Sequence, residues 1–207
     1  MKITFSKNLS ISDHMVFLVV DGKEVLKSDL IDEKVRNLLK NVCKSESFKR
    51  KSFFEFFHYE KSNKIKSISV VKINPSDKLF KLEVLSGKIL MHLEKKKIND
   101  VSVLFEENGI SNKRNFLYSI CRGFVLKDYK FEKYRSVSKK EHNVKSIKLC
   151  NELSSADQKY VLSCANNSKG VFLTRDLVSE PANILYPEKF VDFCKVMKKA
   201  GVSLEIF

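Results

Sequence analysis

Apolar runs of strand length alternate with helix-like apolar patterns along most of this chain. The run at residues 15–20 is unbroken, and the run at residues 101–105 contains a single serine, as in strands buried on both faces of a sheet. Between such runs, apolar residues recur every three or four positions, a spacing that places them on one face of a helix. This alternation favours a largely parallel sheet with helices on both faces. The predicted fold class is therefore α/β, a three-layer α/β/α unit with a mixed sheet.

The individual elements follow from these two spacings, and two local signals refine them. Asp21-Gly22 is typical of a tight hairpin turn. Asn74-Pro75 is typical of a helix start, with Asn as the cap and Pro at the first helical position. Strands are predicted at residues 1–5, 15–20, 23–26, 53–59, 65–73, 101–105, 144–150 and 202–207. Helices are predicted at residues 31–42, 75–93, 111–125, 155–174 and 187–201.

Composition indicates a cytoplasmic protein with no membrane partner. The longest apolar run, residues 15–20, is six residues long, whereas a membrane-spanning helix needs about 20. Residues 1–8 lack the apolar region of a signal peptide. The five cysteines show no C-x-x-C spacing and the four histidines form no H-x-x-x-H pair, so we expect reduced thiols and no metal ion held by this chain.

Two prolines mark a joint in the last part of the chain. Pro181 cannot continue the helical pattern that precedes it, and Pro187 has the backbone angle needed in the first turn of a new helix. One helix therefore ends and another begins within a few residues. Residues upstream are expected to form one compact unit, and residues downstream to begin another.

The sequence around this joint is distinctive. It contains Arg175-Asp176-Leu177, then Glu180-Pro181-Ala182-Asn183 and Pro187, and upstream the segment GFVLKDYKFEKY covers residues 123–134. The first set is similar to the linker R-D-L-x-N-x-P-x-N, followed by a proline, of the cytosolic leucyl aminopeptidase family. The second is similar to that family's G-x-x-L-x-x-Y-x-F-x-x-Y. Ser179 stands where the family usually has Asn.

The resemblance covers residues 113–207 well and the first hundred residues by pattern alone. It implies a macro-domain-like amino-terminal domain over residues 1–172, an interdomain linker and helix over residues 173–201, and the first strand of a catalytic domain over residues 202–207. The parent enzyme it implies is a cytoplasmic hexamer, a metal-dependent exopeptidase that removes amino-terminal residues from peptides with two divalent cations, Zn or Mn.

The family's metal-binding segments, G-K-G-x-x-F-D-S-G-G and N-T-D-A-E-G-R, do not occur in these 207 residues. We therefore expect the chain to be catalytically inactive by itself, as a fragment or a truncated gene product. Its expected partners are its own missing catalytic domain and other copies in the hexamer.

The linker residues are predicted to have a structural role. For Arg175 and Asp176 the alternative is a catalytic ion pair, but the family's active-site arginine belongs to the absent N-T-D-A-E-G-R segment. Asn183 is expected to form hydrogen bonds of turns and helix caps. The predicted structural residues are Arg175, Asp176, Pro181, Asn183 and Pro187.

The net charge of +14 raises an alternative function. Of the 39 basic residues, 39 − 6 = 33 are Lys and are spread over the whole chain, as biased codon usage would give. Residues 127–148, however, hold eight basic residues against three acidic ones, with aromatic side chains interleaved that can stack on bases. The alternative is a DNA-binding or interaction module that retains the fold without enzyme activity. The candidate patch residues are Lys130, Lys133, Arg135, Lys139 and Lys140.

A macro-domain-like fold also raises ADP-ribose as a ligand. Binding of its diphosphate requires glycine-rich loops whose amides approach the phosphates closely. None of the six glycines lies within three residues of another, so no ADP-ribose pocket is predicted.

Overall fold

The computed structural model describes residues 1–6, 14–20, 31, 33–50, 53–59, 65–74, 76–105, 110–136 and 143–206. The strands are β1 Lys2–Phe5, β2 His14–Val20, β3 Phe53–Tyr59, β4 Ile65–Ile73, β5 Asp100–Phe105 and β6 Ser146–Leu149. The helices are α1 Glu33–Lys44, α2 Glu46–Arg50, α3 Leu79–Lys95, α4 Lys113–Asp128, α5 Ser155–Ser179, α6 Pro187–Cys194 and the 3-10 helix η1 Lys195–Ala200.

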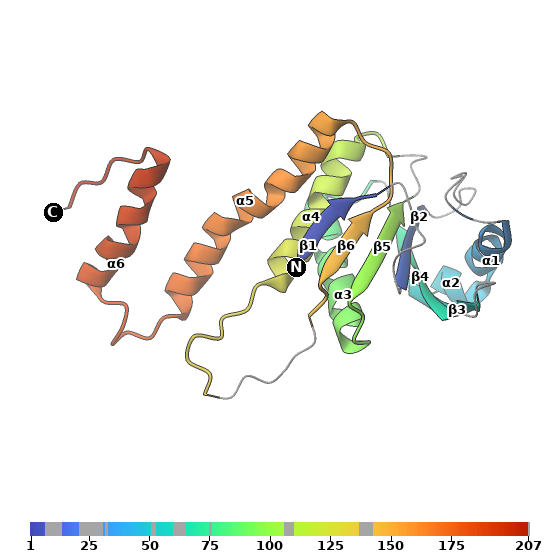
Figure 1. Ribbon diagram of the computed structural model, residues 1–207, viewed down its shortest axis with the longest axis horizontal. Helices are drawn as coiled ribbons and strands as arrows, with labels where there is room; N and C mark the ends of the chain where they lie inside the picture. The colour runs from blue at the N-terminus through green and yellow to red at the C-terminus, as the bar shows by residue number, and fades with distance from the viewer. Residues whose placement is uncertain are drawn as a thin grey trace.

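The six strands form one sheet in the order β1-β6-β5-β2-β4-β3 (Figure 1). All neighbouring strands are parallel except β3 and β4, which are antiparallel. The apolar strand β2 lies between β4 and β5, and all seven of its residues are buried. The predicted mixed, largely parallel sheet is confirmed. The Asp21-Gly22 hairpin and the strand at residues 23–26 lie outside the described residues.

Side chains of β2 alternate between two cores, because successive residues of a strand point to opposite faces. Val16, Leu18 and Val20 contribute to the core shared with α3, α4 and α5. Met15, Phe17 and Val19 contribute to the core on the other face, with Val35 and Leu39 of α1. The sheet therefore has helices on both faces, which confirms the three-layer arrangement.

The start of α3 differs from the sequence-based prediction. The Asn74 side chain accepts a hydrogen bond of 3.0 Å from the amide of Ser76, and the Asn74 carbonyl accepts one of 3.0 Å from Asp77. These bonds close a turn that precedes the helix. The helix itself begins at Leu79, with Lys78 as a cap residue that makes no side-chain capping bond. The predicted start near residue 75 is therefore wrong, because the Asn side chain caps the turn instead of the helix.

Side-chain caps begin the next two long helices. Asn112 Oδ1 accepts from the amide of Asn115 at 2.9 Å, and Ser154 Oγ accepts from the amide of Asp157 at 3.1 Å. Each bond satisfies an amide that the first turn leaves without an intrahelical partner. The helix α5 begins at Ser155, as predicted, and the start of α4 lies two residues after the predicted position.

The last elements agree with the sequence in part. Pro187 occupies the first turn of α6, and Gly201 ends η1 with a φ of 83°, the left-handed cap that glycine favours. Residues 202–206 form no strand. The strand predicted there is not formed in this structure, because a strand needs hydrogen-bonding neighbours and none of the described strands pairs with it. Phe207 lies outside the described residues.

Candidate functional site

The carboxyl-terminal end of α5 forms the joint predicted from the prolines. This helix is 25 residues long and extends beyond the sheet, and α6 lies past its end (Figure 1). The helix stops at Glu180, after which the Pro181 carbonyl accepts hydrogen bonds from the amides of Ile184 at 2.8 Å and Leu185 at 2.9 Å. A short turn therefore reverses the chain before α6 begins.

Arg175 and Asp176 both bind the segment at the end of α4. The Tyr129 hydroxyl donates a hydrogen bond of 2.5 Å to Asp176 Oδ1, and Arg175 Nη1 donates one of 2.9 Å to the carbonyl of Leu126. The Arg175 guanidinium also lies 5.5 Å from the centre of the Tyr129 ring. The two charged residues therefore fix α5 to the end of α4 through separate contacts.

Tyr129 is the centre of this first cluster. Its ring stacks on Phe172 of α5, with ring centres 5.0 Å apart and planes 21° from parallel. Burial, and then the hydrogen bond to the Asp176 carboxylate, raise the pKa of Tyr129 to about 12. The hydroxyl is therefore a hydrogen-bond donor at neutral pH and is not poised to act as a base.

Glu180 holds a second cluster one turn further along. Lys133 Nζ lies 2.6 Å from Glu180 Oε1, and the Tyr134 hydroxyl donates a hydrogen bond to Glu180 Oε2. The Glu180 side chain is only 4% exposed, whereas that of Lys133 is 52% exposed. The Lys133 ammonium and the Tyr134 hydroxyl lower the pKa of Glu180, and the Glu180 carboxylate raises the pKa of Lys133. Both groups are therefore charged at neutral pH.

A cavity of about 330 Å³ lies between the two clusters. Its walls come from residues 130–133, from the last turns of α5 and, through Phe193, from α6. The described lining residues include no histidine, cysteine or serine. The arrangement is suited to fixing the direction in which the chain leaves α5.

Comparison with known proteins identifies relatives of this chain. No protein-family model matches the chain. A probable cytosol aminopeptidase from Wolbachia pipientis is 27% identical over all of this chain and 40% of its own length, and one from Clostridium perfringens is 27% identical over 87% of this chain and 38% of its length. One from Rickettsia massiliae is 30% identical over 70% of this chain and 30% of its length. The chain is a relative of the cytosol aminopeptidases. It spans about two fifths of the length of the first two.

Solved structures support the fold. A tomato leucine aminopeptidase mutant superimposes with a TM-score of 0.75 over 97% of this chain and 42% of its own, at 19% identity. The bottromycin maturation enzyme BotP, solved in complex with Mn, gives a TM-score of 0.62 over 92% of this chain and 37% of its own, at 14% identity. The predicted α/β fold is therefore confirmed, and it is similar to that of the aligned part of the tomato leucine aminopeptidase.

The two segments that resemble the cytosol aminopeptidases are the ones that meet at the joint. Tyr129 and Tyr134 lie in the upstream segment and contact Asp176 and Glu180 in the linker. Sequence reasoning identified Asp176 but missed Glu180, because a variable position of a motif gives no sign of a partner 46 residues away. The two tyrosines of the upstream segment were the available signal.

The other linker residues lie on the surface. Asn183 is exposed in the turn after α5, and its side chain forms no hydrogen bond with a described residue. Pro181 is also exposed and contributes its carbonyl to that turn. Pro187 occupies the first turn of α6.

The structure brings the described basic candidates onto internal partners. Lys130 Nζ donates to Asn143 Oδ1 at 2.6 Å, Lys133 pairs with Glu180, and Arg135 lies 4.0 Å from Glu132. Phe131 and Tyr134 contact each other, with ring centres 5.9 Å apart. Lys139 and Lys140 lie outside the described residues. The stacking surface expected of a nucleic-acid patch is therefore partly used within the protein.

The described residues contain no group of three or more His, Cys, Asp or Glu side chains able to hold a metal ion. The described part of the chain therefore supplies no ligand set for a pair of divalent cations. None of the five cysteines is part of a disulfide bond, and Cys121, Cys150 and Cys164 are buried. No helix in the described part of the chain is long and apolar enough to span a membrane.

Proposed function

We propose that this chain is the non-catalytic amino-terminal domain, with the interdomain linker, of a leucyl aminopeptidase that removes amino-terminal residues from peptides. One observation carries the proposal. A curated cytosol aminopeptidase aligns with all of this chain, while the aligned region is only 40% of that relative. The remaining portion of such a protein would carry the catalytic residues.

In this proposal residues 1–172 form the domain, residues 173–201 the linker with α6, and residues 202–207 the start of the catalytic domain. The clusters around Tyr129 and Glu180 support the linker role, because they fix α5 to the domain at the point where the chain leaves it. A fixed exit direction holds the catalytic domain in one orientation, which can limit access to its active site.

The two cations, Zn or Mn, belong to the catalytic domain of the parent, and no step of the hydrolysis is assigned to this chain. Mn in the BotP complex supports metal use by such a parent. The names of the curated relatives support a cytosolic location. A hexameric parent rests on the family resemblance alone.

A chimera tests the proposal. The 207 residues replace the matching portion of the Wolbachia cytosol aminopeptidase, and the remainder of that protein is kept. We expect the chimera to release leucine from a chromogenic leucine anilide with added Mn²⁺ and to sediment as a hexamer. We expect no release by the 207-residue chain alone. Release by that chain alone would refute the non-catalytic role, and a chimera that is folded by circular dichroism yet inactive would refute the domain assignment.

The second candidate is a DNA-binding or interaction module that retains the fold, favoured by the net charge of +14. This function would appear as a gel shift of duplex DNA by the 207-residue chain that weakens steeply with salt, because phosphate contacts release counterions. If this second candidate is correct, the chimera described above should be inactive.

A further inference from the structure

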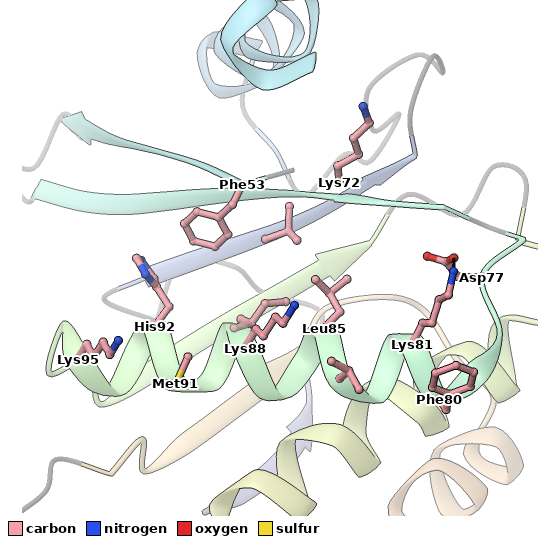
Figure 2. A pocket seen from close by; sticks show the side chains of 13 residues that line it. Phe53, Lys72, Asp77, Phe80, Lys81, Leu85, Lys88, Met91, His92 and Lys95 are labelled. Carbon is pink, nitrogen blue, oxygen red and sulfur yellow. Dashed lines mark hydrogen bonds and ion pairs between the residues drawn. The ribbon is translucent and has the colours of Figure 1, made fainter. Parts of the chain in front are cut away.

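A groove of about 720 Å³ runs along α3 beside the edge of the sheet (Figure 2). On the strand side its wall is formed by Phe53 of β3 and Val71 of β4, and on the helix side by Val84, Leu85 and Met91 of α3. Figure 2 shows Phe53 facing α3, with His92 opposite it; the two rings meet edge to face with centres 4.6 Å apart. The groove therefore has an apolar wall on both sides.

The groove lies where the layer of helices is incomplete. On this face of the sheet α4 packs between α5 and α3, and the described residues place no further helix beyond α3, above β4 and β3. The outer side of α3 accordingly leaves large apolar side chains in contact with water, with Phe80 58%, Val84 53% and Met91 41% exposed. Neighbouring helices pack about 8–10 Å apart, so a fourth helix packed beside α3 would cover the groove.

Lysine side chains make the groove positively charged. Lys81, Lys88 and Lys95 line the groove at intervals of seven residues, which is about 10.5 Å along a helix. Lys81 pairs with Asp77 at 3.1 Å, whereas Lys88 and Lys95 form no ion pair with a described residue. An occupant with carboxylates at the same interval would complement the two exposed lysines.

Two other occupants fit the observations less well. A second copy of this chain would bring another net charge of +14 to a lysine-lined groove, and like charges oppose association. The part of the chain beyond the joint leaves from α5, which lies on the other side of α4 from α3 (Figure 1). The groove therefore faces away from the joint.

We propose that this groove binds an acidic amphipathic helix of a partner protein. The apolar face of that helix packs on Phe53, Val84 and Met91, and two of its carboxylates, spaced two turns apart, pair with Lys88 and Lys95. The docked helix completes the layer formed by α5, α4 and α3. The groove thus acts as a docking site on the domain, separate from the joint.

A fluorescent synthetic helix tests the proposal. The probe is a peptide of about 21 residues, or six turns, with leucines on one face and glutamates at intervals of seven on its flank. Anisotropy is measured with the 207-residue chain at about 0.15 M salt. We expect saturable binding, and binding at least about tenfold weaker for a peptide with lysine in place of every glutamate.

Two double variants with the same change in charge show where on the protein the peptide binds. We expect Lys88→Glu with Lys95→Glu to weaken binding at least about tenfold, since like charges would then face each other. Lys159→Glu with Lys169→Glu, which changes two exposed lysines of α5, should change binding less than about threefold, since screening limits charges beyond about 8 Å. The double variant Val84→Asp, Met91→Asp should also abolish saturable binding of the peptide. Circular dichroism of this variant verifies that the two substitutions at exposed positions leave the fold intact.

Several results would overturn the proposal. The first is that binding of the acidic peptide does not saturate even at millimolar concentration. The second is that the two double lysine variants weaken peptide binding equally, which would indicate non-specific attraction. Dimers that dissociate in the Val84→Asp, Met91→Asp variant would show a second copy in the groove. Duplex DNA that displaces the peptide and requires Lys88 and Lys95 would show a nucleic-acid site.

Discussion

At the scale of the residue, burial of His14 makes the stability of the fold depend on pH. Its side chain is fully buried at the start of β2, with Nε2 2.8 Å from Ser69 Oγ and Nδ1 against Ser67 Oγ. Burial lowers the pKa of His14 from 6.5 to about 4, while the Glu55 carboxylate partly opposes the shift. The folded protein therefore holds a neutral imidazole where the unfolded chain holds a charged one between these two pH values.

This shift predicts acid sensitivity. Because the unfolded state binds the proton more tightly, the free energy of unfolding falls as pH drops below 6.5, and His14 accounts for about 3 kcal/mol of loss by pH 4. Above pH 6.5 the contribution to stability is complete. Urea unfolding of the wild type and of His14→Gln over this range measures the effect. The variant should lose less stability than the wild type between pH 6.5 and 4, and parallel curves would show that His14 titrates normally.

At the scale of the element, Gly123 sets how closely α4 approaches α3. A Cβ atom at this position would lie 2.3 Å from the Glu83 carbonyl oxygen and 2.8 Å from Ser86 Cβ. Arg122 reinforces the contact through an ion pair of 2.9 Å with Glu83. The two helices therefore meet backbone to backbone, which only a glycine allows.

Gly123→Ala should destabilise the protein by about 1–3 kcal/mol, because α3 and α4 must move apart to admit the methyl group. The matched control is Gly170→Ala in α5, where a Cβ would meet nothing within 4 Å. That change should stabilise by up to about 1 kcal/mol, since Ala favours helix more than Gly does. Urea denaturation compares the two. Equal stability of the two variants would mean that the helices are not in close contact.

Most helices and strands could be predicted from the sequence, because the apolar patterns that indicate them involve neighbouring residues. Contacts between residues far apart in the sequence could not be predicted. The unbroken run of β2 predicted a buried strand, and Pro187 a helix start, from neighbouring residues alone. Asn74 was misassigned because turn and helix use the same capping chemistry. At the joint, Asp176 was predicted from its position in the motif. Glu180 was not predicted, because it occupies a variable position of that motif and its partners Lys133 and Tyr134 lie 47 and 46 residues away.

At the scale of the whole molecule, the groove borders α3 and the joint lies at the end of α5. The helix α4 packs between these two helices (Figure 1). The groove has β3 and β4 as its floor, at one edge of the sheet, whereas the joint begins where α5 extends past the sheet. A helix docked in the groove would therefore not contact the joint.

This arrangement predicts where the folding unit ends. None of the residues 181–206 whose exposure is described is buried, whereas α5 buries Val161, Cys164 and Ser168. A chain that stops at Glu180 should therefore melt within about 3 °C of the 207-residue chain. A chain that stops at Leu153 should melt at least about 10 °C lower, because it loses the apolar burial of α5, with each kcal/mol equivalent to about 2–4 °C. Thermal circular dichroism measures both. If removing residues 181–207 costs as much as removing α5, those residues belong to the same folding unit as the sheet.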